Sequence, residues 1–178
     1  MKYYVGIDLG GTNIVAGVVD GDYNIIAKAS TKTNCPRPEK EIAEDMAKMA
    51  VQAVENAKLT MDDIEWIGIG TPGIANSATG IVERANNLGF INTPLVKYVK
   101  EFIGRNDTPV YIENDANAAA YGEYVAGAAK GAKNAVCITL GTGVGAGVGY
   151  ATTGTVKGAA TGAAIGFGAG AAIGAAVG

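Results

Sequence analysis

Short apolar runs recur near the N-terminus of the chain, and they cover about residues 3–8, 13–20 and 24–32. Gly10 and Gly11 separate the first two runs, and Asp20-Gly21-Asp22 separates the second from the third. Glycine and aspartate between β-prone runs are typical of hairpin turns. The pattern therefore predicts an antiparallel meander of three strands.

The period of the apolar residues changes from two to about 3.6 after Pro38. The residues that recur at helical spacing are Ile42, Met46, Met49, Ala50 and Ala53. Acidic residues gather at the start of this stretch, where the helix dipole favours negative charge. The pattern predicts a long helix over about residues 39–58.

Apolar runs and turn residues continue to alternate along the rest of the chain. Strands are expected at about 66–70, 110–112 and 135–140, and helices at 95–103 and 115–128. The expected order through residue 114 is βββαβαβ, and the strand at 135–140 begins a second meander. The fold class is therefore α/β. We expect a first lobe at 1–114, the start of a second lobe at 115–150, and a tail at 151–178.

The C-terminal tail has a different composition, because residues 158–178 hold seven glycines, nine alanines and no charge. A glycine stands at every fourth position from Gly158 to Gly178, which on a helix forms one stripe. Such a helix would be roughly 31 Å long, about the thickness of a bilayer core. Each glycine costs about 1 kcal/mol relative to alanine in an exposed helix. We favour a low-complexity or artificial terminus over a packed hairpin or helix pair, and a membrane span least.

Composition excludes several classes of function. The 178 residues are 48% apolar with a net charge of -3 and no basic stripe, which argues against nucleic-acid binding. The chain has no histidine, and Cys35 and Cys137 lack CxxC spacing, so neither a Cys/His zinc site nor a Ser-His-Asp triad is expected. No signal peptide is visible at Met1, and a cytoplasmic location is therefore expected.

Three motifs at expected strand ends suggest phosphate chemistry. Asp8 precedes a glycine turn that runs to Asn13, and a second glycine turn follows the strand at 135–140. Glycine backbone lets N–H groups approach phosphate oxygens closely. The third motif, Glu113-Asn114-Asp115, supplies a carboxylate that could take a proton from an attacking hydroxyl.

Taken together over about residues 3–145, these motifs resemble the ROK family of sugar kinases, and most closely its bacterial glucokinases. The resemblance rests on the loop from Asp8 to Asn13, Gly70-Thr71-Pro72-Gly73, Asn86-Asn87-Leu88, the stretch from Glu113 to Ala120, Gly122-Glu123, and the stretch from Leu140 to Gly145. It implies an actin-like ATPase fold, related to ribonuclease H. It also implies ATP and Mg²⁺ as cofactors and a small sugar as substrate.

The resemblance also implies a role for each motif residue. Asp8 would hold Mg²⁺ through water, and Asp115 would be the catalytic base. The residues implied to contact the ATP phosphates are Gly10, Gly11, Thr12, Asn13, Gly141, Thr142 and Gly143. Those implied to line the sugar site are Gly73, Asn87, Asn114 and Asp115. Structural roles remain open beside these, because aspartate and asparagine also cap turns and helices and a Pro-Gly pair also forms a plain turn.

The chain departs from the family pattern after about Tyr150. The family's second lobe, with its zinc cluster and further sugar ligands, has no counterpart here. The first hypothesis is a glucokinase that moves the γ-phosphoryl of ATP to the 6-hydroxyl of glucose, present here as an incomplete or remodelled copy. The alternatives are a silent sugar- or phosphate-binding module, and a protein that self-associates or attaches to a membrane through the glycine-rich tail.

Two further expectations concern partners. The family's repressors carry a DNA-binding segment ahead of the Asp8 loop, and the lack of room before Met1 favours the kinase branch. An apolar strand at 135–140 with few neighbours would expose its edge, which favours homo-oligomers or aggregation.

Overall fold

The computed structural model describes residues 2–131, 134–140, 144–150 and 172–177. Its elements are β1 (Tyr3–Leu9), β2 (Asn13–Val19), β3 (Ile25–Lys32), α1 (Glu39–Asn56), the 3-10 turn η1 (Met61–Asp63), β4 (Ile64–Thr71), β5 (Ile74–Asn76), β6 (Ile81–Ala85), β7 (Phe90–Thr93), α2 (Leu95–Ile103), β8 (Val110–Asn114), α3 (Asp115–Ala126), β9 (Asn134–Leu140), β10 (Val144–Tyr150) and β11 (Ala172–Val177).

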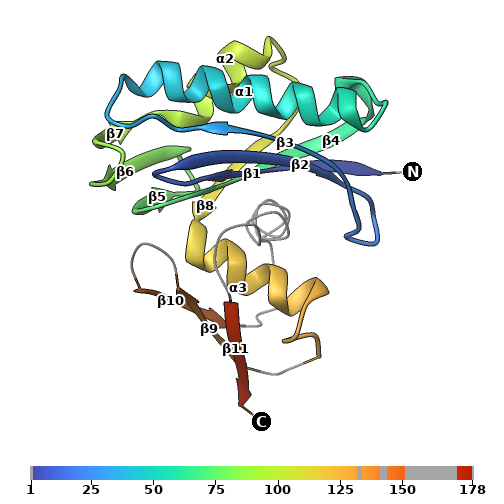
Figure 1. The fold of residues 1–178 in the computed structure, drawn as a ribbon, viewed down its shortest axis with the longest axis vertical. Helices are drawn as coiled ribbons and strands as arrows, with labels where there is room; N and C mark the ends of the chain where they lie inside the picture. Colours follow the sequence, from blue (N-terminus) through green and yellow to red (C-terminus); the bar gives the residue numbers. More distant parts are fainter. Residues whose placement is uncertain (1, 132–133, 141–143, 151–171, 178) are drawn as a thin grey trace.

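The main sheet has five strands in the order β3-β2-β1-β4-β8. Its first three strands form the antiparallel meander that the sequence predicts, while β4 and β8 run parallel to β1. The carboxyl ends of β1, β4 and β8 therefore meet at one edge of the sheet. Figure 1 shows this edge beside the small sheet of β5, β6 and β7.

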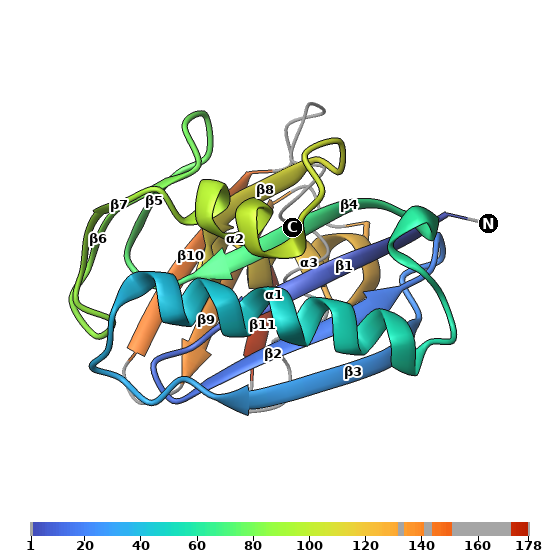
Figure 2. The ribbon, with the colours of Figure 1, turned by 90° about the horizontal axis from the view of Figure 1, so that it is seen from above.

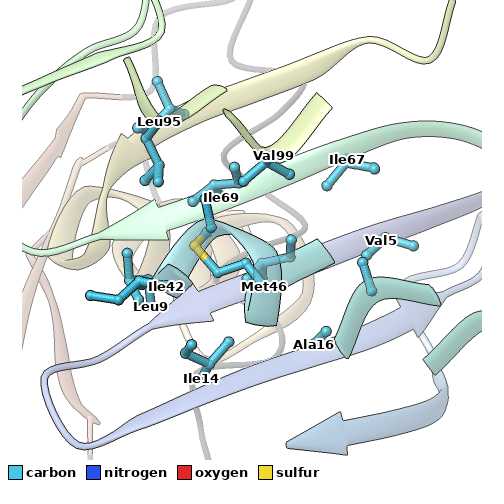
Figure 3. Packing of buried hydrophobic residues seen from close by; sticks show 14 of the residues in the cluster. Val5, Leu9, Ile14, Ala16, Ile42, Met46, Ile67, Ile69, Leu95 and Val99 are labelled. Carbon is cyan, nitrogen blue, oxygen red and sulfur yellow. The ribbon is translucent and has the colours of Figure 1, made fainter. Parts of the chain in front are cut away.

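One face of the main sheet is covered by α1 and α2, as Figures 1 and 2 show. Alternate residues of β1, namely Val5, Ile7 and Leu9, are fully buried. The predicted apolar stripe of α1 packs on this face, where Ile42 and Met46 are also fully buried (Figure 3). The strand with an apolar period of two and the helix with a period of 3.6 therefore pack together in one hydrophobic core.

The opposite face of the main sheet carries a row of glycines at the middle of its strands. Gly6 pairs with Gly17 on one side and with Gly68 on the other. The alanine-rich α3 lies below this face, between the main sheet and the sheet formed by β9, β10 and β11 (Figure 1). A Cβ built on Gly70 would lie 3.7 Å from the Cβ of Ala118, which places α3 directly against β4.

The small antiparallel sheet β5-β6-β7 was not predicted, so the order βββαβαβ is incomplete. These strands are only three to five residues long, and they include polar residues such as Glu83 and Arg84. Their alternation is too short to register as a period of two. The sheet extends the chain between β4 and α2.

β9 and β10 pair as an antiparallel hairpin. The third strand, β11, pairs with β9 and not with β10. The expectation that the strand at 135–140 leaves an exposed edge is therefore wrong, because β9 is the central strand of its sheet.

The tail was expected to be helical or irregular. Its residues 172–177 instead form the strand β11. Glycine disfavours a helix, and an unpaired edge of β9 offers these residues a full ladder of backbone hydrogen bonds. Residues 151–171 and 178, which carry most of the glycine stripe and of the segment weighed as a membrane span, lie outside the described residues. No helix in the described ranges has the length and apolar character needed to cross a membrane.

Candidate functional site

The candidate site is built at the carboxyl ends of the three parallel strands. In the register of the sheet, Asp8 of β1 is level with Gly70 of β4, and Gly70 is level with Glu113 of β8. β8 continues directly into α3, whose first residue is Asp115. Parallel pairing thus brings carboxylates from distant parts of the sequence to one edge.

Gly70 sits between these carboxylates without a side chain of its own. A Cβ at this position would lie 3.7 Å from the Cα of Asp115 and 3.9 Å from the carbonyl oxygen of Ile7, next to Asp8. β1 and the start of α3 therefore approach Gly70 from two sides. A Cβ at Gly70 would thus be in van der Waals contact with both β1 and α3.

Asp8 is the most perturbed carboxyl group of the site. Burial raises its pKa from 3.8 to about 6, and repulsion from Asp115 adds to the rise. A like charge and a poorly solvated position both disfavour the ionised form. A positive charge near Asp8 would therefore favour its ionised form.

Asp115 lies on the exposed side of the site, at the first turn of α3. Partial desolvation raises the pKa of its carboxyl, although the N–H of Ala116 donates to its Oδ1 at 2.8 Å and opposes the rise. A carboxylate that is both accessible and more basic than usual is suited to accept a proton.

Asn114 joins α3 to the turn that follows β4. Its Oδ1 accepts hydrogen bonds from the N–H groups of Ala116 at 3.0 Å and Asn117 at 3.2 Å, which caps the helix. Its Nδ2 donates to the carbonyl oxygen of Gly73 at 2.9 Å. The capping role that the sequence left open is therefore present, and the same side chain holds the Gly73 turn against the site.

Gly73 has no alternative residue at its position. Its φ of +88° lies in the left-handed region, and a Cβ would stand 2.0 Å from the carbonyl oxygen of Arg84. Positive φ and close backbone approach are the two conditions that require glycine. The turn after β4 is thus fixed against β6.

The glycine loop from Gly10 to Asn13 forms the other wall of the site. The N–H of Gly10 donates to the carbonyl oxygen of Asn13 at 2.9 Å and closes the turn. Within the described part of the chain, the N–H groups of Gly11 and Thr12 have no hydrogen-bond acceptor. Asn87 reaches this loop from the β6–β7 turn, since its Nδ2 lies 3.3 Å from a Cβ placed on Gly11.

The structure thus brings most of the predicted site residues to one edge of the sheet. They are Asp8, Gly10, Gly11, Thr12, Asn13, Gly73, Asn87, Asn114 and Asp115. Gly141, Thr142 and Gly143 lie outside the described residues, between the end of β9 and the start of β10. Among the residues that are described, no group of three or more histidine, cysteine, aspartate or glutamate side chains could hold a metal ion.

Three residues at the site were given no role from the sequence: Gly70, Glu113 and Thr33. Glu113 Oε1 accepts from the N–H of Asn114 at 2.9 Å and from Nδ2 of Asn117 at 3.1 Å, which stiffens the start of α3. Gly70 and Glu113 belong to the recognised motifs, and the register of the parallel strands places both at the site. No residue pattern around Thr33 indicates that it lies at the site.

The fold and the residues at this edge of the sheet agree with the protein family that the sequence motifs indicated. The chain belongs to the ROK family, whose family model matches residues 4–170. The resemblance found in the sequence motifs is thereby confirmed.

Individual relatives show what this chain is similar to. A glucokinase of Streptomyces coelicolor is 42% identical over 144 residues, which cover 81% of this chain and 42% of that protein. A xylose repressor of Bacillus spizizenii is 32% identical over 145 residues, which cover 80% of this chain and 36% of that protein. The chain therefore spans less than half the length of both curated relatives.

A solved structure gives the same match in three dimensions. The ROK family glucokinase of Streptomyces griseus, in complex with glucose and AMPPNP, aligns with a TM-score of 0.73 and 37% identity. The alignment covers 83% of this chain and 44% of that one. Because the family holds both kinases and repressors, membership alone does not choose between catalysis and regulation.

Proposed function

We propose that this chain carries the first lobe of an ATP-dependent sugar kinase that transfers the γ-phosphoryl of ATP to the 6-hydroxyl of glucose. The observation that carries the proposal is the placing of Asp115 beside Asp8, with the side-chain-free Gly70 near both. Alongside lies a glycine loop with two N–H groups that find no acceptor among the described residues. The glucokinases among the relatives support the choice of substrate.

In this proposal Asp115 is the general base. It takes the proton of the sugar hydroxyl as the hydroxyl oxygen attacks the γ-phosphorus, and the bond to the bridging oxygen breaks to release ADP. Asn114, Gly73 and Asn87 line the sugar site, and Asn114 keeps its capping role because its two ends bind different partners. A base of this kind contributes about 10² to 10⁴ in rate.

In this proposal the backbone of the glycine loop binds the phosphates. The N–H groups of Gly11 and Thr12, which have no acceptor in the described ranges, would meet phosphate oxygens, and Gly10 and Asn13 close the turn. Asp8 suits Mg²⁺ held through water, since Mg²⁺ is usually bound by one or two carboxylates together with substrate phosphates. When bound, Mg²⁺ would neutralise charge on the phosphates, and it would also offset the burial and repulsion that Asp8 experiences.

The domain division is part of the same proposal. Residues 1–114 form the kinase lobe, 115–150 begin the second lobe, and 151–178 form the tail. Gly141, Thr142 and Gly143 would hold ATP from the second lobe. A cytoplasmic location and self-association of the chain belong to the proposal as well.

A second candidate is a sugar- or phosphate-binding module without turnover. It is favoured by the glycine loop and the Asn114–Gly73 contact, which can hold a ligand without catalysing a reaction.

The two candidates are separated by measuring binding and turnover on the same preparation. Isothermal titration with glucose and with Mg-ATP reports binding, and a coupled assay reports ADP release. Binding with glucose-dependent ADP release supports the kinase, and binding without it supports the silent module. Absence of both kinds of binding would contradict both candidates.

A further inference from the structure

Thr33, the first residue after β3, is fully buried and bonded twice to the glycine loop. Its hydroxyl donates to the carbonyl oxygen of Gly10 at 2.6 Å, and its own N–H donates to the carbonyl oxygen of Thr12 at 2.9 Å. The carbonyl groups of Gly10 and Thr12 are therefore turned toward Thr33.

The first of these bonds fixes the direction of an N–H group. In a planar trans peptide the C=O of one residue and the N–H of the next point in opposite directions. Because the carbonyl of Gly10 points at Thr33, the N–H of Gly11 points away from it. This is one of the two loop N–H groups that have no acceptor within the described residues.

Thr33 is itself held from the far side by Arg37. Nε of Arg37 donates to the carbonyl oxygen of Thr33 at 2.7 Å, and Nη2 donates to Oδ2 of Asp45 on α1 at 2.5 Å. The two side chains of this ion pair are only 18% and 24% exposed. A continuous chain of hydrogen bonds thus runs from α1 through Arg37 and Thr33 to the glycine loop.

We propose that Thr33 is a positioning residue for phosphate binding: it fixes the Gly10 peptide so that the N–H of Gly11 faces the ligand. The inference rests on the proposed function, because the ligand it serves is the phosphate of Mg-ATP. Thr33 touches no substrate in this proposal. Its effect reaches the ligand only through the shape of the loop.

The test replaces the hydroxyl while keeping the shape of the side chain. Thr33→Val removes the donor to Gly10 and leaves the backbone bond to Thr12, whereas Thr33→Ser keeps the donor. Thr31→Val is the matched control, because Thr31 stands two residues earlier, near the end of β3, and its hydroxyl makes no hydrogen bond in the described part of the chain. The readouts are amide hydrogen exchange of Gly10 and Gly11 by NMR, and the Kd values of Mg-ATP and glucose.

We expect Thr33→Val to speed exchange of the Gly10 amide and to weaken Mg-ATP binding, each by about tenfold, with glucose binding unchanged. Thr33→Ser and Thr31→Val should stay within about twofold of wild type. Equal Gly10 exchange in wild type and Thr33→Val would overturn the positioning of the loop by Thr33. Faster exchange with an unchanged Kd for Mg-ATP would overturn its role in phosphate binding.

The same data keep this inference apart from the proposed function. If Mg-ATP fails to bind wild type or to slow exchange of the Gly11 amide, the proposed function and the phosphate role fall together. The comparison of Gly10 exchange between the variants still decides whether Thr33 positions the loop. Loss of folding in Thr33→Val, seen as a collapsed NMR spectrum, with full retention in Thr33→Ser would support the hydroxyl contact.

Discussion

The carboxyl groups of Asp8 and Asp115, which are separated by more than half of the sequence, lie close enough that Asp115 helps to raise the pKa of Asp8 to about 6. One ends a strand and the other begins a helix, and parallel pairing through β4 brings them together. Two ionised carboxyl groups that lie close together repel each other unless a cation or a proton neutralises one of them. The arrangement therefore gains stability from either, and this is the basis for expecting a metal-dependent site.

The first prediction concerns pH. The folded pKa of Asp8 is about 6 and its ordinary value is 3.8, so the folded state holds more protons between these values than the unfolded state. The free energy of unfolding should therefore fall as pH rises from 4 to 7. Without divalent cations, we expect Asp8→Asn to be more stable than wild type by about 2 kcal/mol at pH 7 and similar to it at pH 4. Urea unfolding at both pH values measures this, and parallel pH profiles would contradict it.

The second prediction concerns the turn after β4. Gly73→Ala places a Cβ 2.0 Å from the carbonyl oxygen of Arg84 at a positive φ, so we expect a loss of at least about 3 kcal/mol of unfolding free energy. Gly89→Ala is the matched control. Its φ of +72° is also positive but its Cβ would meet nothing within 4 Å, so only the conformational cost of about 1 kcal/mol remains. Equal losses in urea unfolding would show that close packing at Gly73 has no part.

The third prediction separates the two functions of Asn114. Asn114→Ala should cost about 1 to 2 kcal/mol because α3 loses its cap, whereas Asn114→Ser restores a capping oxygen and should recover most of that loss. Both variants lose the amide Nδ2 that donates to the carbonyl oxygen of Gly73, so both should bind glucose more weakly. Urea unfolding and titration with glucose measure the two effects. Full glucose affinity in Asn114→Ser would reduce this residue to a helix cap.

Much of the site could be predicted from the sequence because its motifs are local. Asp8 and the glycine loop follow one apolar run directly, and Asn114 and Asp115 follow another. A strand that ends in a turn or a helix fixes the side chains at the junction, and parallel strands bring such junctions to one edge. Local order and one topological rule were therefore sufficient to gather these residues.

Other parts depend on contacts that no short window of sequence contains. β5, β6 and β7 are too short to show a period. The main local signs of them in the sequence are Gly80 and Gly89, whose φ is positive in the structure. Thr33 meets the glycine loop only because Asn13 pairs with Lys32 in the β2–β3 register. The strand at residues 172–177 requires β9 as a partner, so composition alone favoured a helix or an irregular tail.

The central claim is that Asp115 accepts the proton of a sugar hydroxyl during phosphoryl transfer. The most direct measurement is ADP release from Mg-ATP by wild type and Asp115→Asn, with and without glucose, on samples whose glucose binding has been measured. We predict glucose-dependent release by wild type and a loss of at least about hundredfold in Asp115→Asn with glucose binding retained. Equal rates in the two proteins, or no glucose dependence in wild type, would contradict the account.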